Sequence, residues 1–182
     1  MKLKIALALI ICALLISCAS AGGSGDSGVD GSGNYVRNGD FSRFASDWPN
    51  LPYNWSTTFK GGDGYSPIKT ENGRFIGWAE NLYSFTLHQN IAGLTPGKYF
   101  LTAEFRLNPD SIVDDMVMNV WSGRTLLASL SVAAELRGAP RETDIMYELL
   151  DIDVPSNSVR IEFIGTDILK YIGIDNVFFA KQ

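Results

Sequence analysis

Short stretches of the sequence alternate between apolar and polar residues. In residues 100–107 every second side chain from Leu101 is apolar, and Thr102, Glu104 and Arg106 stand between them. Residues 117–121 and 159–163 follow a similar scheme. A two-residue period is typical of strands that are buried on one face only. Turn signals rich in Pro, Gly and Asn separate these stretches, at residues 95–97, 108–110, 122–123, 137–140 and 155–157.

Many short strands joined by such turns predict an all-β domain, a single β-sandwich or jelly roll. The pattern allows one short helix, at residues 126–136, although this segment could equally be a strand. The chain of 182 residues has the length of one folded domain.

Composition argues against several classes of function. The chain has 15 basic and 20 acidic side chains, which give a net charge of −5, whereas nucleic-acid-binding proteins usually carry a basic surface. One histidine and two cysteines leave little for a metal cluster or a histidine-dependent catalytic triad. We expect no nucleic-acid partner and a binding or structural role.

The first 34 residues have the composition of an export signal and a linker. Lys2 and Lys4 precede an apolar run at residues 5–16 that is too short to span a bilayer. The sequence Leu-Ile-Ser-Cys that ends at Cys18 resembles the lipobox of bacterial lipoproteins, in which the cysteine is lipidated. This resemblance implies a signal peptide at residues 1–17; the alternative is an ordinary signal peptide that is cleaved near residues 19–21.

Residues 18–34 then form a Gly/Ser-rich linker, and all 21 aromatic residues follow it. We therefore place the folded domain at residues 35–182. Cys18 would be the only cysteine left after cleavage, so no disulfide is expected in the exported protein.

Three motifs in the domain resemble those of a known group of proteins. Residues 38–41, Asn-Gly-Asp-Phe, with Trp48 soon after, are similar to the opening of carbohydrate-binding modules related to families four and nine. Residues 87–99 resemble the central strand–turn–strand of these modules, and residues 173–177 resemble the closing strand. The motifs cover nearly all of residues 35–181, and as turns and core positions they explain folding without reference to a sugar. The resemblance implies a non-catalytic, galactose-binding-like jelly roll.

Related jelly rolls often hold a structural calcium ion near the first and last strands. Asp40 and Asp175 stand at matching positions, and carboxylate oxygens suit calcium. Ser42 replaces the acidic residue that often follows the opening aspartate, which weakens the match. The resemblance thus implies no cofactor other than a possible structural calcium.

A sugar-binding surface needs aromatic faces and hydrogen-bonding side chains. The polar face of the alternating strands offers one candidate patch, with the alternative that it is a solvated face with ion pairs between strands. Its members are Glu104, Arg106, Asn119, Trp121, Arg160 and Glu162.

Two further candidates are loop or strand aromatics. Tyr53 and Trp55, in a loop that two prolines stiffen, could form a stacking platform at the rim of a cleft or could cap the open edge of the sandwich. Trp78, which Glu80 and Asn81 follow, is a third candidate.

The sequence gives little support to catalysis. Glycosidases use two carboxylates across the scissile bond. Asp114 and Asp115 would point to opposite faces of a strand, which leaves Glu104 and Glu162 as the other acidic candidates. His88 has no evident Asp or Cys partner, and the chain has no phosphate loop, nucleophile elbow or zinc spacing.

We therefore predict a non-enzymatic lipoprotein that binds a polysaccharide or oligosaccharide by aromatic stacking and hydrogen bonds in a shallow cleft. The residue after Cys18 is Ala19 rather than aspartate, which by resemblance to lipoprotein sorting favours the outer membrane, on its surface or periplasmic side. Glycan-degrading or uptake proteins are the expected protein partners. The alternative is a structural or protein-interaction jelly roll without sugar binding.

Overall fold

The fold was analysed in a computed structural model, which describes residues 32–45, 49–63 and 66–182. The predictions for residues 1–17, Cys18, most of the linker and Trp48 lie outside these residues. Eight strands and one short helix follow in the order β1 (Ser56–Gly61), β2 (Ile68–Glu71), β3 (Arg74–Ala92), β4 (Gly97–Leu107), β5 (Ile112–Ser122), β6 (Thr125–Ser131), α1 (Ala133–Gly138), β7 (Ile145–Val154) and β8 (Ser158–Lys181).

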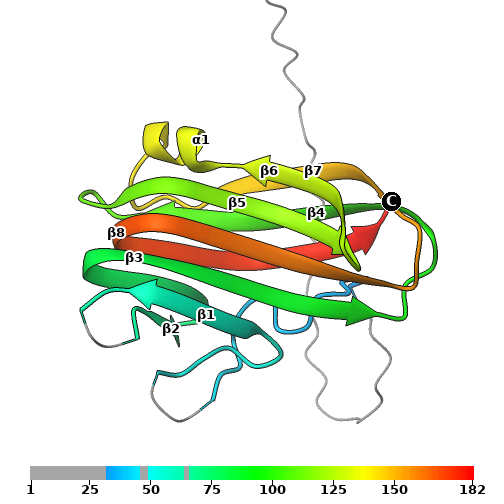
Figure 1. Cartoon of the computed structure of the whole chain (residues 1–182), viewed down its shortest axis with the longest axis horizontal. Coiled ribbons are helices and arrows are strands. Elements are labelled where there is room, and N and C mark those ends of the chain that lie inside the picture. The colour runs from blue at the N-terminus through cyan, green and yellow to red at the C-terminus, as the bar shows by residue number, and fades with distance from the viewer. Residues whose placement is uncertain (1–31, 46–48, 64–65) are drawn as a thin grey trace, which may run out of the picture.

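Two long strands, β3 and β8, run through both layers of a β-sandwich (Figure 1). Residues 158–169 of β8 lie between β5 and residues 83–92 of β3, and β6 and β1 complete this layer, which we call the β5 sheet. Beyond these segments the same strands form a second layer, the β4 sheet, in which β8 pairs with β4 and β3 pairs with β2. β7 forms its far edge beside β4. All pairs are antiparallel, and the predicted all-β sandwich is confirmed.

Both long strands change course where they pass from one sheet to the other. The register between them shifts between Ala79 and Tyr83, and Lys170 of β8 has a positive φ of 63°. The carboxylate of Asp63 accepts hydrogen bonds from the backbone amides of Glu80 and Asn81, at 2.7 and 3.1 Å, and so stabilises the bend of β3. Because of these bends, a single strand presents residues to both outer faces of the molecule.

The space between the sheets is filled by alternate side chains of the strands. Leu101, Ala103 and Phe105 of β4 are fully buried, as the alternating pattern predicts. Phe41 of the opening motif is also buried, and its ring lies 6.1 Å from that of Phe75. Apolar area removed from water contributes roughly 25 cal/mol per Å², so this aromatic and aliphatic core is the main source of stability.

The segment at residues 126–136 contains both predicted alternatives. Its first part belongs to β6, which pairs with β5, and its second part forms most of α1. Ala133 and Leu136 of α1 are buried, so the helix covers one end of the core. In the part of the chain that the structure describes, no helix has the length and apolar character needed to cross a membrane.

The N-terminal end of the domain is attached to the last strand. The amide of Tyr35 donates to the carbonyl of Phe179 at 2.9 Å, and the side chain of Asn34 bonds to Val177 and Phe179. Val177 also donates its amide to the carbonyl of Gly39 at 2.9 Å. A Cβ atom on Gly39 would lie 2.1 Å from the carbonyl oxygen of Val177, which explains the glycine in the opening motif.

Candidate functional site

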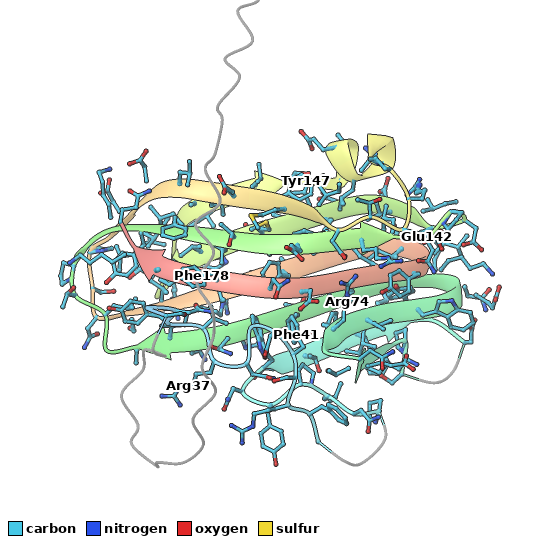
Figure 2. All side chains as sticks on the ribbon, turned by 180° about the vertical axis from the view of Figure 1, so that it is seen from behind. Arg37, Phe41, Arg74, Glu142, Tyr147 and Phe178 are labelled. Carbon is cyan, nitrogen blue, oxygen red and sulfur yellow. The ribbon has the colours of Figure 1, made fainter. Side chains whose placement is uncertain are left out.

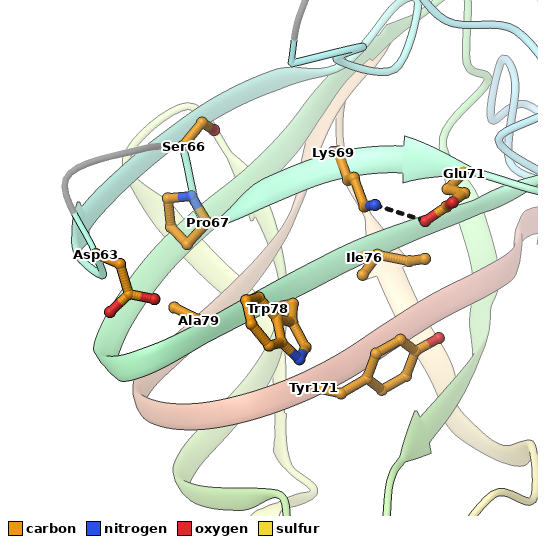
Figure 3. Close-up of a pocket in the computed structure, with 9 residues that line it drawn as sticks. All are labelled: Asp63, Ser66, Pro67, Lys69, Glu71, Ile76, Trp78, Ala79 and Tyr171. Carbon is orange, nitrogen blue, oxygen red and sulfur yellow. Dashed lines mark ion pairs between the residues drawn. The ribbon is translucent and has the colours of Figure 1, made fainter.

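The outer face of the β4 sheet carries a groove with a cavity volume of about 460 Å³ (Figure 3). Its floor comes from β3 and β8, and one wall comes from β2 and the segment that precedes it. The residues that line it are Asp63, Ser66, Pro67, Lys69, Glu71, Ile76, Trp78, Ala79 and Tyr171. Several of these are apolar or aromatic, which is typical of ligand sites in which a few polar groups set the orientation.

Trp78 and Tyr171 form the aromatic floor of the groove. They are directly paired in the antiparallel register of β3 and β8, so their side chains stand on the same outer face. Trp78 is 47% exposed although it is a large aromatic side chain. Its backbone amide donates to the carbonyl of Pro67, which fixes the strand under the indole. Ile76 extends the apolar floor by two positions along β3.

Charged side chains stand on the wall of this groove. Lys69 and Glu71, on the outer side of β2, form an ion pair at 2.6 Å (Figure 3). Asp63 lies at the opposite end of the groove, where its carboxylate already accepts hydrogen bonds from the bend of β3. The groove therefore combines an apolar floor with donors and acceptors at its edge.

Next to the groove, Arg74 of β3 is the centre of a polar network on the same face. Figure 2 labels its side chain. Its guanidinium group binds Asp144 at 2.5 Å and Asp175 at 3.3 Å. Glu104 of β4 is paired with Asp175 in register, and its carboxylate accepts the side-chain amide of Asn176 at 2.8 Å. Three strands and the segment before β7 thus contribute polar groups beside the aromatic floor.

The charges of this network influence one another. Burial raises the pKa of the Asp175 carboxyl above its usual value, and Glu104 adds to this effect. The amide of Asn176 and the guanidinium of Arg74 oppose it by stabilising the carboxylate. Burial alone would lower the pKa of Arg74, but the hydrogen bond and charge of Asp144 raise it above its ordinary value. Arg74 therefore remains charged and holds the network in place.

The structure does not bring the six residues of the predicted strand patch together. Glu104 and Arg106 face outward from the β4 sheet, beside Asp175 and Gly173 of β8. The other four face outward from the β5 sheet, on the opposite side of the sandwich; they are Asn119, Trp121, Arg160 and Glu162. The expectation of a single patch is wrong because alternation tells which face of a strand is polar but not to which sheet the strand belongs.

Trp121 has its polar edge engaged by the protein. Its Nε1 donates to Glu162 at 2.9 Å, and the guanidinium of Arg160 lies 5.6 Å from its ring centroid. Arg160 also forms an ion pair with Glu162 at 3.2 Å. Asn119, which is paired with Glu162 in the sheet, is buried and accepts a hydrogen bond from the hydroxyl of Ser129. These contacts match the alternative reading of the strand patch, in which ion pairs and hydrogen bonds cross a solvated face.

Tyr53 and Trp55 do not form a common platform. Trp55 is only 8% exposed, its ring packs against Phe41 and Phe163, and its Nε1 donates to the carbonyl of Asn38 at 3.1 Å. The prediction of an exposed Trp55 is therefore wrong, and its position fits the alternative in which it closes an edge of the sandwich. Tyr53 is 51% exposed, with Arg43 over its ring.

Asp40 and Asp175, the predicted calcium ligands, are each engaged by groups of the protein. In residues 32–45, 49–63 and 66–182 no three His, Cys, Asp or Glu side chains are grouped so as to hold a metal ion. Asp40 accepts the amide and hydroxyl of Ser42, at 3.2 and 3.0 Å, while Asp175 is paired with Arg74. Calcium needs six to eight oxygen ligands. Calcium binding thus stays a prediction, and thermal unfolding with and without a chelator tests it.

Solved structures of carbohydrate-binding modules have the same fold. A family 61 module, in complex with β-1,4-galactotriose, aligns with a TM-score of 0.57 and 16% identity over 82% of this chain and 99% of its own. A family 4 module aligns with a TM-score of 0.54 and 15% identity, over 81% and 99% of the two chains. The chain has the β-sandwich fold of carbohydrate-binding modules. No protein-family model and no curated protein matches the sequence.

The same fold also occurs as part of a larger protein. The enzymatically active domain of tailspike protein 4 from bacteriophage CBA120 aligns with a TM-score of 0.54 and 20% identity, over 81% of this chain but only 21% of its own length. The identities are low, so these likenesses concern the fold, and the site has to be argued from its own residues.

The sequence analysis predicted Trp78 as a site residue but did not predict Tyr171 or Arg74. Arg74 follows the Asn72-Gly73 turn and was not recognised, because the carboxylates that bind it are distant in sequence. Tyr171 stands in an apolar run and carried no separate signal. Only the register between β3 and β8 places it beside Trp78.

Proposed function

We propose that this protein binds a polysaccharide or oligosaccharide non-catalytically, in the groove on the outer face of the β4 sheet. The observation that carries the proposal is the exposed indole of Trp78 beside Tyr171 in a groove of about 460 Å³. Flat aromatic faces bury the C–H faces of sugar rings, while the polar network around Arg74 can bond to hydroxyl groups. The fold shared with carbohydrate-binding modules supports this choice.

The polar residues near the groove suit binding better than bond cleavage. Glu104 and Asp175 are neighbouring carboxylates beside the groove and are therefore the candidates for a catalytic pair. Each, however, already forms a hydrogen bond with another group of the protein. Asp175 is bonded to Arg74 and to the amide of Asn176, and Glu104 to the side chain of Asn176. We therefore assign these residues to the orientation of hydroxyl groups rather than to acid–base chemistry.

The place of action that we propose is the bacterial outer membrane. The lipobox-like sequence before Cys18 and the Gly/Ser-rich linker would hold the domain close to the membrane, on its surface or periplasmic side. Captured glycan could then pass to degrading or uptake proteins of the same envelope. Incorporation of labelled palmitate into the protein, and its loss in Cys18→Ser, tests the lipid anchor.

Tryptophan fluorescence titration with a panel of soluble glycans tests the binding function. The panel contains β-1,4-galactan, xylan, mannan, β-glucans and host glycans. We expect a saturable change with at least one glycan, and its loss in Trp78→Ala. Trp121→Phe is the matched control, because it alters a tryptophan on the opposite sheet.

Each result of the titration has a definite meaning. Binding that survives Trp78→Ala but is lost in Trp121→Phe would move the site to the β5 sheet. The absence of binding to every glycan, confirmed by calorimetry, would contradict the proposal. The protein-interaction jelly roll would then be the better interpretation.

A further inference from the structure

A second aromatic platform lies on the same outer face as Trp78. Phe100 of β4 and Phe178 of β8 are stacked, with ring centroids 5.7 Å apart and an angle of 27° between the ring planes. Both are only partly buried, whereas their chain neighbours Leu101 and Phe179 are fully buried in the core. The Phe100–Phe178 pair therefore presents apolar surface to the outside of the β4 sheet. Figure 2 labels Phe178 on β8.

The two platforms are connected by one strand. Tyr171 and Phe178 are seven positions apart on β8, which corresponds to about 20 Å at the rise of a β-strand. The outer positions between them are those of Gly173 and Asp175, and Arg106 and Glu104 flank them from β4. A continuous surface thus runs from one aromatic pair to the other.

The middle of this surface is polar and is ordered by hydrogen bonds. Arg74 binds Asp175, and Asn176 binds Glu104. The side chains of Arg74 and Tyr171 also lie over Gly173, since a Cβ atom there would be within 2.8 Å of each. Hydroxyl groups of a sugar chain can exchange bonds with such a network, while the rings at both ends cover its C–H faces.

Charge on this face favours a neutral ligand. The basic side chains there include Lys69, Arg74, Lys98 and Arg106. The acidic side chains there or at its edge are more numerous, and they include Asp63, Glu71, Glu104, Asp144, Glu148, Asp153 and Asp175. Lys69 and Arg74 are already paired with acidic groups. A carboxylated or sulfated chain would meet an excess of like charge.

We infer that the outer face of the β4 sheet binds an extended, neutral glycan chain that follows β8 from the Trp78–Tyr171 pair to the Phe100–Phe178 pair. This inference rests on the proposed function and adds the length and charge class of the ligand. With an aromatic pair at each end, this surface accepts internal segments of a polysaccharide rather than only its chain ends.

Calorimetric titration of the purified protein with oligosaccharides of increasing length tests the inference. The probes are β-1,4-galacto-oligosaccharides and cello-oligosaccharides of two to six units. We expect the hexasaccharide to bind about tenfold more tightly than the trisaccharide, a gain equivalent to about 1.4 kcal/mol. The double variant Phe100→Ala/Phe178→Ala should bind the hexasaccharide no better than the trisaccharide. Phe59→Ala removes an exposed ring from β1 of the other sheet and should change neither affinity.

A chemically matched probe tests the charge class. The hexasaccharide with its primary hydroxyls oxidised to carboxylates should bind at least about tenfold more weakly than the parent, at low ionic strength, where the repulsion is least screened. Equal or tighter binding of the oxidised chain would overturn the neutral specificity.

The outcomes separate this inference from the proposed function. Trisaccharide binding that is lost in Trp78→Ala, together with no gain for the hexasaccharide, would leave the proposed function in place and overturn the inference. A length gain that survives in the double phenylalanine variant would also overturn it. If neither series binds, and the glycan panel fails as well, both proposals are wrong.

Discussion

Trp78 of β3 and Tyr171 of β8 are cross-strand partners, and their rings share the outer face of the β4 sheet. The two side chains come from segments 93 positions apart in sequence, so the register of two long strands creates the platform. Partners in an antiparallel pair have Cβ atoms about 5 Å apart, which lets two rings contribute to one surface. The pair is held by the sheet itself and needs little ordering when a ligand binds.

Tyr171→Ala should weaken glycan binding about tenfold, whereas Tyr171→Phe should retain most of the affinity. The ring supplies stacking area, and the phenylalanine variant keeps this area while it removes only the hydroxyl. Calorimetry with the glycan that binds the native protein measures both effects. An equal loss in the two variants would show that the hydroxyl rather than the ring makes the contact.

Trp55→Ala should lower the free energy of unfolding by about 3–5 kcal/mol, the usual cost of removing a buried aromatic side chain. The change leaves a cavity beside Phe41 and Phe163 and removes the hydrogen bond to Asn38. Urea denaturation measures the difference. Tyr53→Ala, at an exposed position of the same loop, is the control and should change stability by less than about 1 kcal/mol. A stable Trp55→Ala protein would contradict the packing described above.

Gly39→Ala should destabilise the domain by about 3 kcal/mol or more, because the new Cβ atom collides with the carbonyl oxygen of Val177. Gly138→Ala is a matched control. It lies in α1 with nothing within 4 Å of the added atom, so alanine should be neutral or stabilising there by up to about 1 kcal/mol. Thermal unfolding of the two variants provides the comparison. Equal melting temperatures would contradict the close approach of the opening motif to β8.

Arg74→Met should raise the pKa of the Asp175 carboxyl further. In the native protein the guanidinium of Arg74 opposes the effect of burial on this pKa, and the variant lacks that opposition. A carboxyl whose pKa is raised by folding stabilises the folded state most at low pH, and this contribution is lost as the pH rises through the folded-state pKa. The destabilisation caused by Arg74→Met should therefore be greater at pH 7 than at a pH below 3.8, the ordinary pKa of an aspartate side chain.

Carbon-13 NMR titration of the Asp175 carboxyl, with urea denaturation at both pH values, measures the effect of Arg74→Met. Lys69→Met is the control, since its ion pair with Glu71 lies on the same face without contact to Asp175. An unchanged titration of Asp175 in Arg74→Met would refute the coupling.

The sequence predicted the class of fold because the two-residue period follows directly from strand geometry. It did not predict the two-sheet topology, since β8 passes from one sheet to the other at bends that no turn signal marks. Arg160 and Asp175 lie on the same strand, yet one faces outward from the β5 sheet and the other from the β4 sheet. For this reason the predicted patch was assembled from two opposite faces.

The aromatic residues show the same limit at the level of single side chains. Tyr53, Trp55 and Trp78 were all candidates for stacking, and composition alone does not distinguish a buried ring from an exposed one. Trp55 is buried because the loop folds it between Phe41 and Phe163, while Trp78 is exposed because its strand position points outward. Exposure depends on long-range pairing, which local sequence does not encode.

The attachment of the N-terminal end to β8 has a mechanical consequence. Tyr35 and Asn34 are bonded to Phe179 and Val177, on the strand that also carries the proposed glycan surface. If the chain is pulled from its N-terminal side while the domain holds a glycan, part of the force passes through the hydrogen bonds that join Asn34 and Tyr35 to Val177 and Phe179 of β8. The resistance of the complex to drag would then depend in part on the few hydrogen bonds that join Asn34 and Tyr35 to β8.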